Sequence, residues 1–194
     1  MRVPTMRLLA LIGVVGCLVL GSPLAGEVED RLAGSRAATG EFAMALKSAL
    51  SSAMASGGPT YAVDVCQEQA PEIAAQVSQA KGWDVGRTSL RLRNSNNAPD
   101  AWERGVLEEF ERRVAGGEDP QQMEQYAVVS ANGQDEFRYM KAIPTQPVCL
   151  TCHGEALAPS VAARLKEAYP QDQATGFSVG DLRGAFTIRQ PLQE

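Results

Sequence analysis

Apolar residues recur every three to four positions through residues 27–56, which is the spacing of one face of an amphipathic helix. The recurring residues are Leu32, Phe42, Leu46, Ala49, Leu50 and Ala53. This pattern predicts a long N-terminal helix that ends at the sequence Gly57-Gly58-Pro59. The same spacing makes Met44 and Met54 candidate core residues.

A second helical pattern follows over residues 61–81, where Val65, Ile73 and Val77 keep the same spacing. Pro71 lacks an amide hydrogen and fixes its own φ, so we expect it to break or restart this helix. Cys66 would then lie just before a kink, where a turn can expose its side chain from a rigid element.

The pattern changes from helical to alternating in the middle of the chain. Residues 88–93 alternate polar and apolar side chains, which predicts a half-buried strand with its arginines on one face. A loop over residues 94–99 follows. Asp100 and Glu103 then have the spacing of a capping box, so we expect a helix that runs to about Ala115.

Residues 126–130 and 136–143 are strand-like, and the intervening Asn132-Gly133 is a strong signal for a hairpin. We therefore predict two antiparallel strands. A short helix capped by Ser160 and a last strand over residues 184–190 complete the chain. These elements predict an α+β fold in which helices flank an antiparallel sheet.

The N-terminus has the features of a secretory signal peptide. Arg2 and Arg7 precede an apolar run over residues 8–20, and small residues follow as far as Ala25. The run is shorter than the roughly 20 residues that a helix needs to span a bilayer. We expect cleavage near Ala25, which leaves residues 26–194 as a single periplasmic domain. Residues 14–17 also resemble a lipoprotein processing box, so lipid at Cys17 and membrane association through it stay an alternative.

Composition excludes one class of partner. The chain has 23 acidic and 18 basic residues, with a net charge of −5. No basic block is present to neutralise a row of phosphates, so we expect no nucleic-acid partner. Aromatic residues make up 6% of the chain, and a large flat cofactor could supply part of the core.

The sequence Cys149-Leu150-Thr151-Cys152-His153 has the form of a c-type haem attachment motif. Two thiols at this spacing each bond one haem vinyl group, and the adjacent histidine reaches the iron as proximal ligand. His153 is the only histidine. A thioredoxin-type pair, a structural disulfide and half a zinc site share the Cys-x-x-Cys spacing, but zinc would have only Cys66 as a further mature cysteine.

We therefore expect one covalently bound haem c. We do not expect an enzyme, because a peroxidase would need a second histidine as distal acid and base.

No Met, His or Cys follows His153, so a second axial ligand must come from upstream. The candidates are Cys66, Met44, Met54, Met123 and Met140, followed by a lysine or a tyrosine. Cys66 is the first choice, because it has no partner left in an oxidising compartment. It could instead be a buried apolar residue or pair two molecules.

Several separated blocks resemble one family, the haem c-binding, PAS-like domain family of exported bacterial proteins. The blocks are residues 70–74, 82–94, 99–103 and 180–186. Relatives in that family are input domains of membrane histidine kinases and chemoreceptors. The resemblance implies a PAS-like sheet, haem attachment at Cys149 and Cys152, His153 as proximal ligand, and Cys66 as the other axial ligand. Without a kinase segment, the chain would act through a redox or signalling protein partner.

Such a ligand set has a functional consequence. A thiolate favours ferric iron and a low reduction potential, and its bond should weaken on reduction. We expect a sensor of redox state or of a diatomic gas, with a small low-potential electron-transfer cytochrome as the alternative. Arg87, Arg91 and Arg93 could pair with haem propionates or form a solvated strand face.

Overall fold

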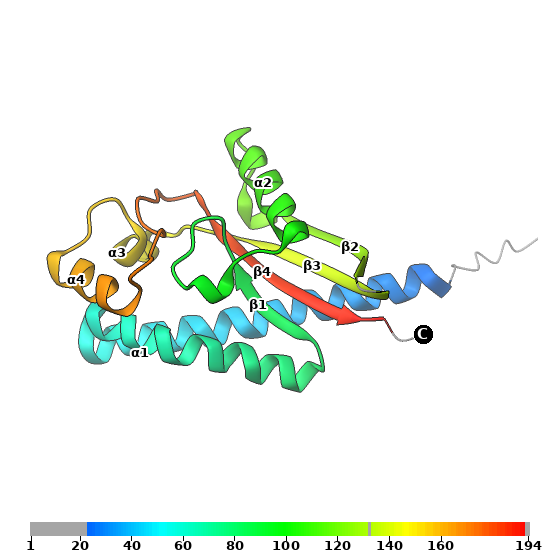
Figure 1. Ribbon diagram of the computed structural model, residues 1–194, viewed down its shortest axis with the longest axis horizontal. Helices are drawn as coiled ribbons and strands as arrows, with labels where there is room; N and C mark the ends of the chain where they lie inside the picture. The colour runs from blue at the N-terminus through cyan, green and yellow to red at the C-terminus, as the bar shows by residue number, and fades with distance from the viewer. Residues whose placement is uncertain (1–22, 132, 193–194) are drawn as a thin grey trace, which may run out of the picture.

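The structure is a computed structural model that describes residues 23–131 and 133–192 (Figure 1). Residues 1–22, which carry most of the predicted signal peptide and Cys17, lie outside the described residues, as does Asn132 of the predicted hairpin. Within the described ranges, no helix has the length and apolar character needed to cross a membrane.

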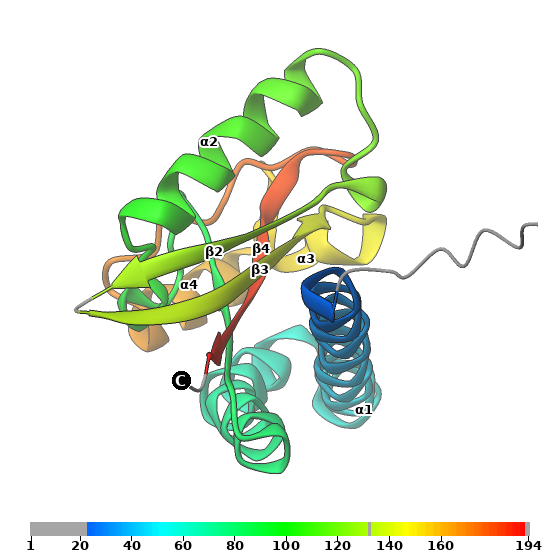
Figure 2. The ribbon, with the colours of Figure 1, turned by 90° about the vertical axis from the view of Figure 1, so that its right-hand side faces the viewer.

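One long helical segment is followed by four strands and three shorter helices in the described part of the chain. The elements are α1 (Pro23–Lys81), β1 (Asp84–Thr88), α2 (Ala101–Ala115), β2 (Glu124–Ala131), β3 (Gln134–Pro144), α3 (Leu150–His153), α4 (Pro159–Ala168) and β4 (Leu182–Pro191). The strands form one sheet of order β1-β4-β3-β2, and all neighbours are antiparallel. Figure 2 shows α1 on one side of this sheet and α2 on the other. The predicted α+β class, with an antiparallel sheet flanked by helices and a long N-terminal helix, is confirmed.

The segment α1 is a helical hairpin that reverses at Gly58 (Figure 1). Gly58 has φ 74° and ψ −169°, a backbone conformation that only glycine adopts readily. The predicted helix end at Gly57-Gly58-Pro59 is therefore confirmed.

The predicted break at Pro71 is wrong, because the second half of α1 continues through it. Pro71 and Gln67 are both exposed, so water can hydrate the Gln67 carbonyl that loses its amide donor. Burial of Ala70 and Val77 on the inner face stabilises the continuous helix. Cys66 accordingly lies within a regular helix.

The predicted strand at residues 88–93 is also wrong in position, since β1 ends at Thr88. Ser89 Oγ accepts a hydrogen bond from the Arg91 amide at 3.1 Å and donates one to the Arg183 carbonyl at 2.9 Å. A side-chain hydroxyl that bonds the local backbone favours a turn over a continued ladder. Arg91 and Arg93 consequently lie in a loop beyond the end of β1.

The sequence also predicted one hairpin and two helix caps, and the structure confirms the hairpin and one of the caps. The β2–β3 hairpin is confirmed, with Ala131 opposite Gln134 in the register. The capping box is confirmed, since Asp100 and Glu103 each accept the other's backbone amide, at 2.8 and 2.9 Å. Ser160 was the wrong cap for α4. Pro159 occupies the first turn with its φ already helical, so the cap is Ala158 and the helix begins two residues earlier than predicted.

Two apolar clusters lie on opposite sides of the sheet. The cluster against α1 contains Leu32, Phe42, Val77, Val85, Phe137, Tyr139 and Ile188. The cluster against α2 contains Val106, Leu107, Phe110, Met123, Met140, Ala142, Leu182 and Ala185. Met44, predicted as a core residue, is 70% exposed, because a residue two positions after Phe42 points to the opposite side of the helix.

A buried charge cluster fastens α2 to the sheet. The carboxylate of Glu103, which is 2% exposed, accepts a hydrogen bond from the Thr187 hydroxyl at 2.8 Å. The same oxygen lies 3.3 Å from the Arg138 guanidinium and 3.4 Å from that of Arg189. Arg138 is itself buried, so loss of Glu103 would leave a buried charge with less compensation.

We therefore expect Glu103→Ala to lower the free energy of unfolding by about 3–5 kcal/mol, as measured by urea denaturation. Glu108 is an exposed glutamate on the same helix, and Glu108→Ala serves as the control, with a change within about 0.5 kcal/mol. Equal effects of the two substitutions would contradict this role of the cluster.

Candidate functional site

The Cys-x-x-Cys-His sequence lies where β3 leaves the sheet. A turn over Pro147–Cys149 leads directly into α3, which carries Cys152 and His153. Figure 1 shows α3 and α4 at the end of the molecule where α1 reverses. Three predicted site residues are thus held in one short, rigid segment.

The chain after α3 folds back to brace it. The Phe177 amide donates to the His153 carbonyl and the Gly176 amide to the Gly154 carbonyl, both at 2.9 Å. Gly154 has little room for a side chain, since a Cβ there would lie 2.6 Å from the Leu150 carbonyl oxygen. Residues 174–177 therefore form one wall beside His153.

Helix α4 joins this segment to the part of α1 that carries Cys66. Arg164 of α4 forms an ion pair with Asp64, and Gln67 donates a hydrogen bond to the Ala168 carbonyl at 3.0 Å. Asp64 and Gln67 flank Cys66 in the sequence. The same contact region contains an apolar cluster of Val63, Val161 and Leu165, against which Cys152 packs.

Cys66 and Cys152 are both half-buried free cysteines. Burial raises the pKa of the Cys152 thiol, and negative charge on Cys66 raises it further. Burial also raises the pKa of Cys66, while Arg87 and Arg93 oppose that rise. The α1 segment that carries Cys66 packs with Cys152 through the Val63 cluster, although 83 positions separate Cys66 from Cys149 in the sequence.

The imidazole of His153 is held in one tautomer. Its Nδ1 lies 2.7 Å from the Ala174 carbonyl oxygen, which can only accept, so Nδ1 carries the hydrogen and Nε2 keeps its lone pair. Arg183 Nε lies 3.1 Å from Nδ1, and this contact is then a repulsion between two N–H groups. A ring nitrogen held by a carbonyl in this way orients the other nitrogen toward a metal.

The same surroundings keep His153 neutral. Burial lowers its pKa to about 2, and the Arg183 and Arg93 guanidinium groups contribute to that shift. Metal binding requires a neutral imidazole. A neutral His153 with a free Nε2 therefore suits iron ligation, while the neighbouring Cys149 and Cys152 thiols suit covalent attachment of a cofactor.

Arg93 is the arginine that contacts the motif directly. It forms a 3.0 Å ion pair with Asp172, donates to the Cys152 carbonyl at 2.6 Å, and lies 3.4 Å from His153 Nε2. Its side chain is 13% exposed. A solvated strand face is therefore the wrong interpretation of this arginine, because the chain turns inward after β1.

Arg91 and Arg183 both lie beside the ring of Phe177. Their guanidinium carbons are 4.0 and 5.3 Å from its ring centroid, and Arg183 also donates to Ser89 Oγ at 3.2 Å. Sequence reasoning missed Arg183, Asp172 and the Ala174 carbonyl as parts of the site. Only Arg183 had a signal, since it lies in the 180–186 block of the family resemblance.

Arg87 lies on β1, opposite Phe186 in the register, with its guanidinium carbon 5.8 Å from the ring centroid of Phe42. Burial lowers the pKa of Arg87, whereas Cys66 and Tyr169 oppose that shift. Across the described part of the chain, its side chain makes no hydrogen bond or ion pair. Arg87 is thus a half-buried cation without a polar partner in the described ranges.

The site has an excess of positive charge. Of the carboxylates in the described ranges, Asp172 alone forms an ion pair with Arg87, Arg91, Arg93 or Arg183. Buried charges are normally compensated by counterions or by several hydrogen bonds. The arrangement can therefore hold an anionic group beside a neutral imidazole.

A hollow of about 450 Å³ adjoins this region. It is lined by Glu155, Leu157, Ala162, Leu165, Lys166, Tyr169, Pro170, Asp172 and Thr175. Leu157 and Tyr169 also pack in the cluster that contacts Cys152. The hollow thus extends from the apolar surroundings of Cys152 to the acidic partner of Arg93.

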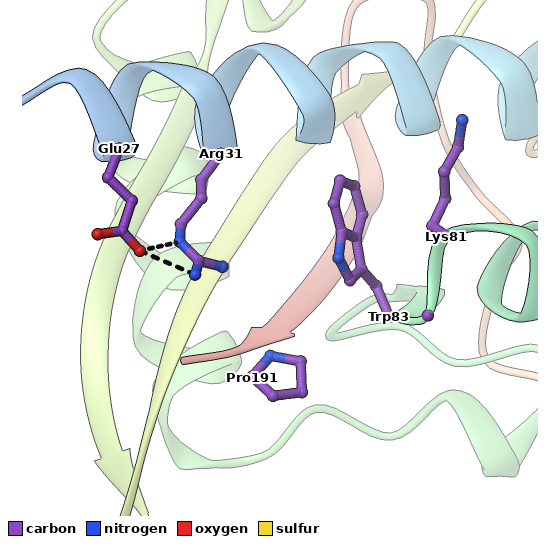
Figure 3. Close-up of a pocket in the computed structure, with 6 residues that line it drawn as sticks. Glu27, Arg31, Lys81, Trp83 and Pro191 are labelled. Atoms are coloured by element: carbon purple, nitrogen blue, oxygen red, sulfur yellow. Dashed lines mark hydrogen bonds and ion pairs between the residues drawn. The ribbon is translucent and has the colours of Figure 1, made fainter. Parts of the chain in front are cut away.

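A second hollow, of about 500 Å³, lies near the two ends of α1 and contains no predicted site residue (Figure 3). Its cations are already paired, Arg31 with Glu27 and Lys81 with Glu41, each at 2.9 Å. Trp83 and Pro191 complete its wall. This hollow has none of the uncompensated charge of the His153 region.

The methionines considered as axial ligands lie elsewhere. Met123 and Met140 are fully buried in the cluster against α2, and Met44 is exposed. Met54 packs against the Ala53, Ala62 and Val65 cluster inside the α1 hairpin. Of the upstream sulfur candidates, Cys66 is the one on the part of α1 that contacts α4, through its neighbours Asp64 and Gln67.

Asp172 is expected to hold the wall beside His153. Its two oxygens bind the Arg93 guanidinium and, at 2.8 Å, the Ala174 amide. Asp172→Ala should lower the free energy of unfolding by about 2 kcal/mol, because it leaves a buried guanidinium without its carboxylate. The measurement is urea denaturation against Glu72→Ala, an exposed control. Matching midpoints for the two variants would refute this role.

The chain is similar to one protein family and to one solved structure. The family model described as Tll0287-like (Tll0287) matches residues 26–191. The crystal structure of the cyanobacterial heme-protein Tll0287 is similar, with a TM-score of 0.60 and 25% sequence identity. The match covers 90% of this chain and 99% of that one. A search of curated proteins found no match.

Proposed function

We propose that this chain, which belongs to the Tll0287-like family, is an exported mono-haem c-type cytochrome that works as a redox-sensing or diatomic-gas-sensing module rather than as an enzyme. Cys149 and Cys152 hold the haem by thioether bonds, and His153 is the proximal iron ligand. Cys66 is the second axial ligand. A haem protein among its relatives supports the choice of cofactor.

The observation that carries this proposal is the state of His153. Its Nδ1 hydrogen is directed at the Ala174 carbonyl, which leaves the Nε2 lone pair for a metal. His153 follows Cys152 directly in the sequence, as a covalent haem site requires. Since Arg93 lies 3.4 Å from Nε2, its guanidinium must move when haem is bound.

The surrounding charge supports a haem in particular. Haem carries two propionates, and the excess of guanidinium groups over carboxylates around His153 offers partners for them. The apolar wall of Leu157, Leu165 and Tyr169 supports burial of a flat macrocycle. Bound haem would supply one-electron chemistry and an iron that can take a sixth ligand.

The position of Cys66 favours a sensor over a plain electron carrier. Cys66 lies in a helical turn of α1 that also carries Asp64 and Gln67. Both of these neighbours contact α4. Asp64 and Arg164 are each about one-third exposed, so their ion pair contributes little stability and can rearrange. Release of Cys66 from iron would therefore rearrange the contact between α1 and α4. A partner protein that binds this surface would recognise the change.

The test is the optical spectrum of the purified holoprotein in the ferric and ferrous states, with and without carbon monoxide. We expect a six-coordinate ferric spectrum and carbon monoxide binding after reduction, because ferrous iron holds a thiolate weakly. Ferrous haem that stays six-coordinate and ignores carbon monoxide would contradict the sensor and favour a low-potential electron carrier.

A further inference from the structure

We propose that Arg183 sets the reduction potential of the haem iron through His153, by holding an uncompensated positive charge against the imidazole. The inference rests on the part of the proposed function that makes His153 an iron ligand, and it does not depend on Cys66. Arg183 is a positioning residue here, since it touches His153 and not the iron. Its charge favours ferrous over ferric iron, which raises the potential at which the protein responds.

The first argument is the side of the imidazole on which Arg183 lies. Its Nε is 3.1 Å from His153 Nδ1, whereas Nε2 is the nitrogen left for iron. Nδ1 donates its hydrogen to the Ala174 carbonyl at 2.7 Å. Arg183 therefore contacts the nitrogen that does not bind the metal. Its guanidinium can stay in place in the holoprotein, in contrast to that of Arg93, which lies 3.4 Å from Nε2.

The second argument is that neutral groups hold Arg183 against a nitrogen that repels it. Its Nη1 donates to the Ser89 hydroxyl at 3.2 Å and to the Arg91 carbonyl at 3.3 Å. The guanidinium carbon lies 5.3 Å from the ring centroid of Phe177. That ring packs edge-on against the imidazole of His153, with 6.2 Å between the centroids. These contacts fix the cation beside the imidazole, although two N–H groups face each other there.

The third argument is that the charge of Arg183 is not compensated by a carboxylate of the described ranges. Arg93, the other arginine that contacts His153, has its charge neutralised by the 3.0 Å ion pair with Asp172. The acceptors that Arg183 uses are a hydroxyl and a carbonyl, which carry no net charge. Arg183 is thus the arginine whose full charge acts on the imidazole.

The fourth argument is electrostatic. Ferric iron carries one more positive charge than ferrous iron, so a fixed cation nearby destabilises the ferric form more. Hydrogen-bonding partners of an axial ligand tune haem potentials in the same way. Reduction moves one electron from an added reductant to the iron, and no bond of Arg183 or His153 forms or breaks in that step.

The test is a redox titration of the holoprotein with dithionite as reductant, followed by the optical spectrum. At a fixed solution potential, Arg183→Gln should lower the ratio of ferrous to ferric protein at least tenfold, which is a fall in potential of about 59 mV for one electron. Arg183→Lys keeps the charge, and its ratio should stay within about threefold of the native value. Equal falls in the two variants would assign the effect to packing and overturn the proposal.

The matched control is Arg31→Gln. It removes the same side chain at the other hollow, where Arg31 is paired with Glu27 (Figure 3), and the ratio should not change. If Arg183→Gln fails to fold, Arg183→Met keeps an apolar stem beside Phe177 and should give the same tenfold fall. An unchanged potential in a folded neutral variant overturns the proposal.

A second measurement separates an effect through His153 from a contact with a haem propionate. His153 is the only histidine, so a chain labelled with nitrogen-15 histidine gives one pair of ring resonances in the diamagnetic, low-spin ferrous state. Arg183→Gln should shift the Nδ1 resonance, and Arg31→Gln should not. A lowered potential with an unchanged Nδ1 resonance would assign Arg183 to a propionate and overturn the proposal. Failure of the proposed function is distinguishable, because it would appear in the native chain as protein without covalent haem.

Discussion

A chain that carries both Cys149→Ala and Cys152→Ala should lose covalently attached haem altogether. The two sulfurs are the only thioether donors next to His153 in the motif. Protein from a host that matures c-type cytochromes should be red when native and keep its colour through acid-acetone extraction. The double variant should bleach in that extraction and give no haem stain on a denaturing gel.

The matched control is Cys66→Ala, which also removes a half-buried thiol of this region. That variant should keep its full haem stain, because Cys66 contributes an axial ligand and no thioether bond. A native chain without haem stain would remove the basis of the proposed function. A double variant that retained the stain would show that other residues attach the haem.

The second large effect is expected at Cys66 itself. Cys66→Met should raise the reduction potential by on the order of 0.1 V or more, because a neutral thioether stabilises ferrous iron relative to a thiolate. A spectroelectrochemical titration gives the potential, and electron paramagnetic resonance of the ferric form reports the ligand set. The low-spin signal should change together with the potential.

Met54→Leu is the control for Cys66→Met, since it alters a sulfur inside the same α1 hairpin that packs with other apolar side chains. Its potential should match that of the native chain. If Cys66→Met left both the potential and the ferric signal unchanged, Cys66 would be a packed thiol and the sixth ligand would have to come from another residue.

Features that depend on neighbours in the sequence were predicted well. The reversal at Gly58, the capping box of Asp100 and Glu103, and the β2–β3 hairpin each follow from backbone chemistry within a few residues. The helical spacing around Phe42 likewise predicted which face of α1 is buried. Pro71 is the exception, because packing of the helix on both sides of it outweighs one lost hydrogen bond.

The sequence also misjudged where several side chains point. Met44 was assigned to the core from helical spacing, although it is 70% exposed on the outer face of α1. Arg91 and Arg93 were placed on a strand that ends before them, because the Ser89 hydroxyl bonds to Arg183, a residue 94 positions away. Contacts of that range have no local signal.

The sequence by itself determined the α+β class and the motif of Cys149, Cys152 and His153, because periodicity and fixed spacing are properties of short segments. Tertiary structure alone decided what surrounds that motif. The Ala174 carbonyl that fixes His153, the Asp172 partner of Arg93 and the α4 contacts beside Cys66 all join segments distant in the chain. Their closeness depends on how the α1 hairpin, the sheet and α4 pack together, which no short segment specifies.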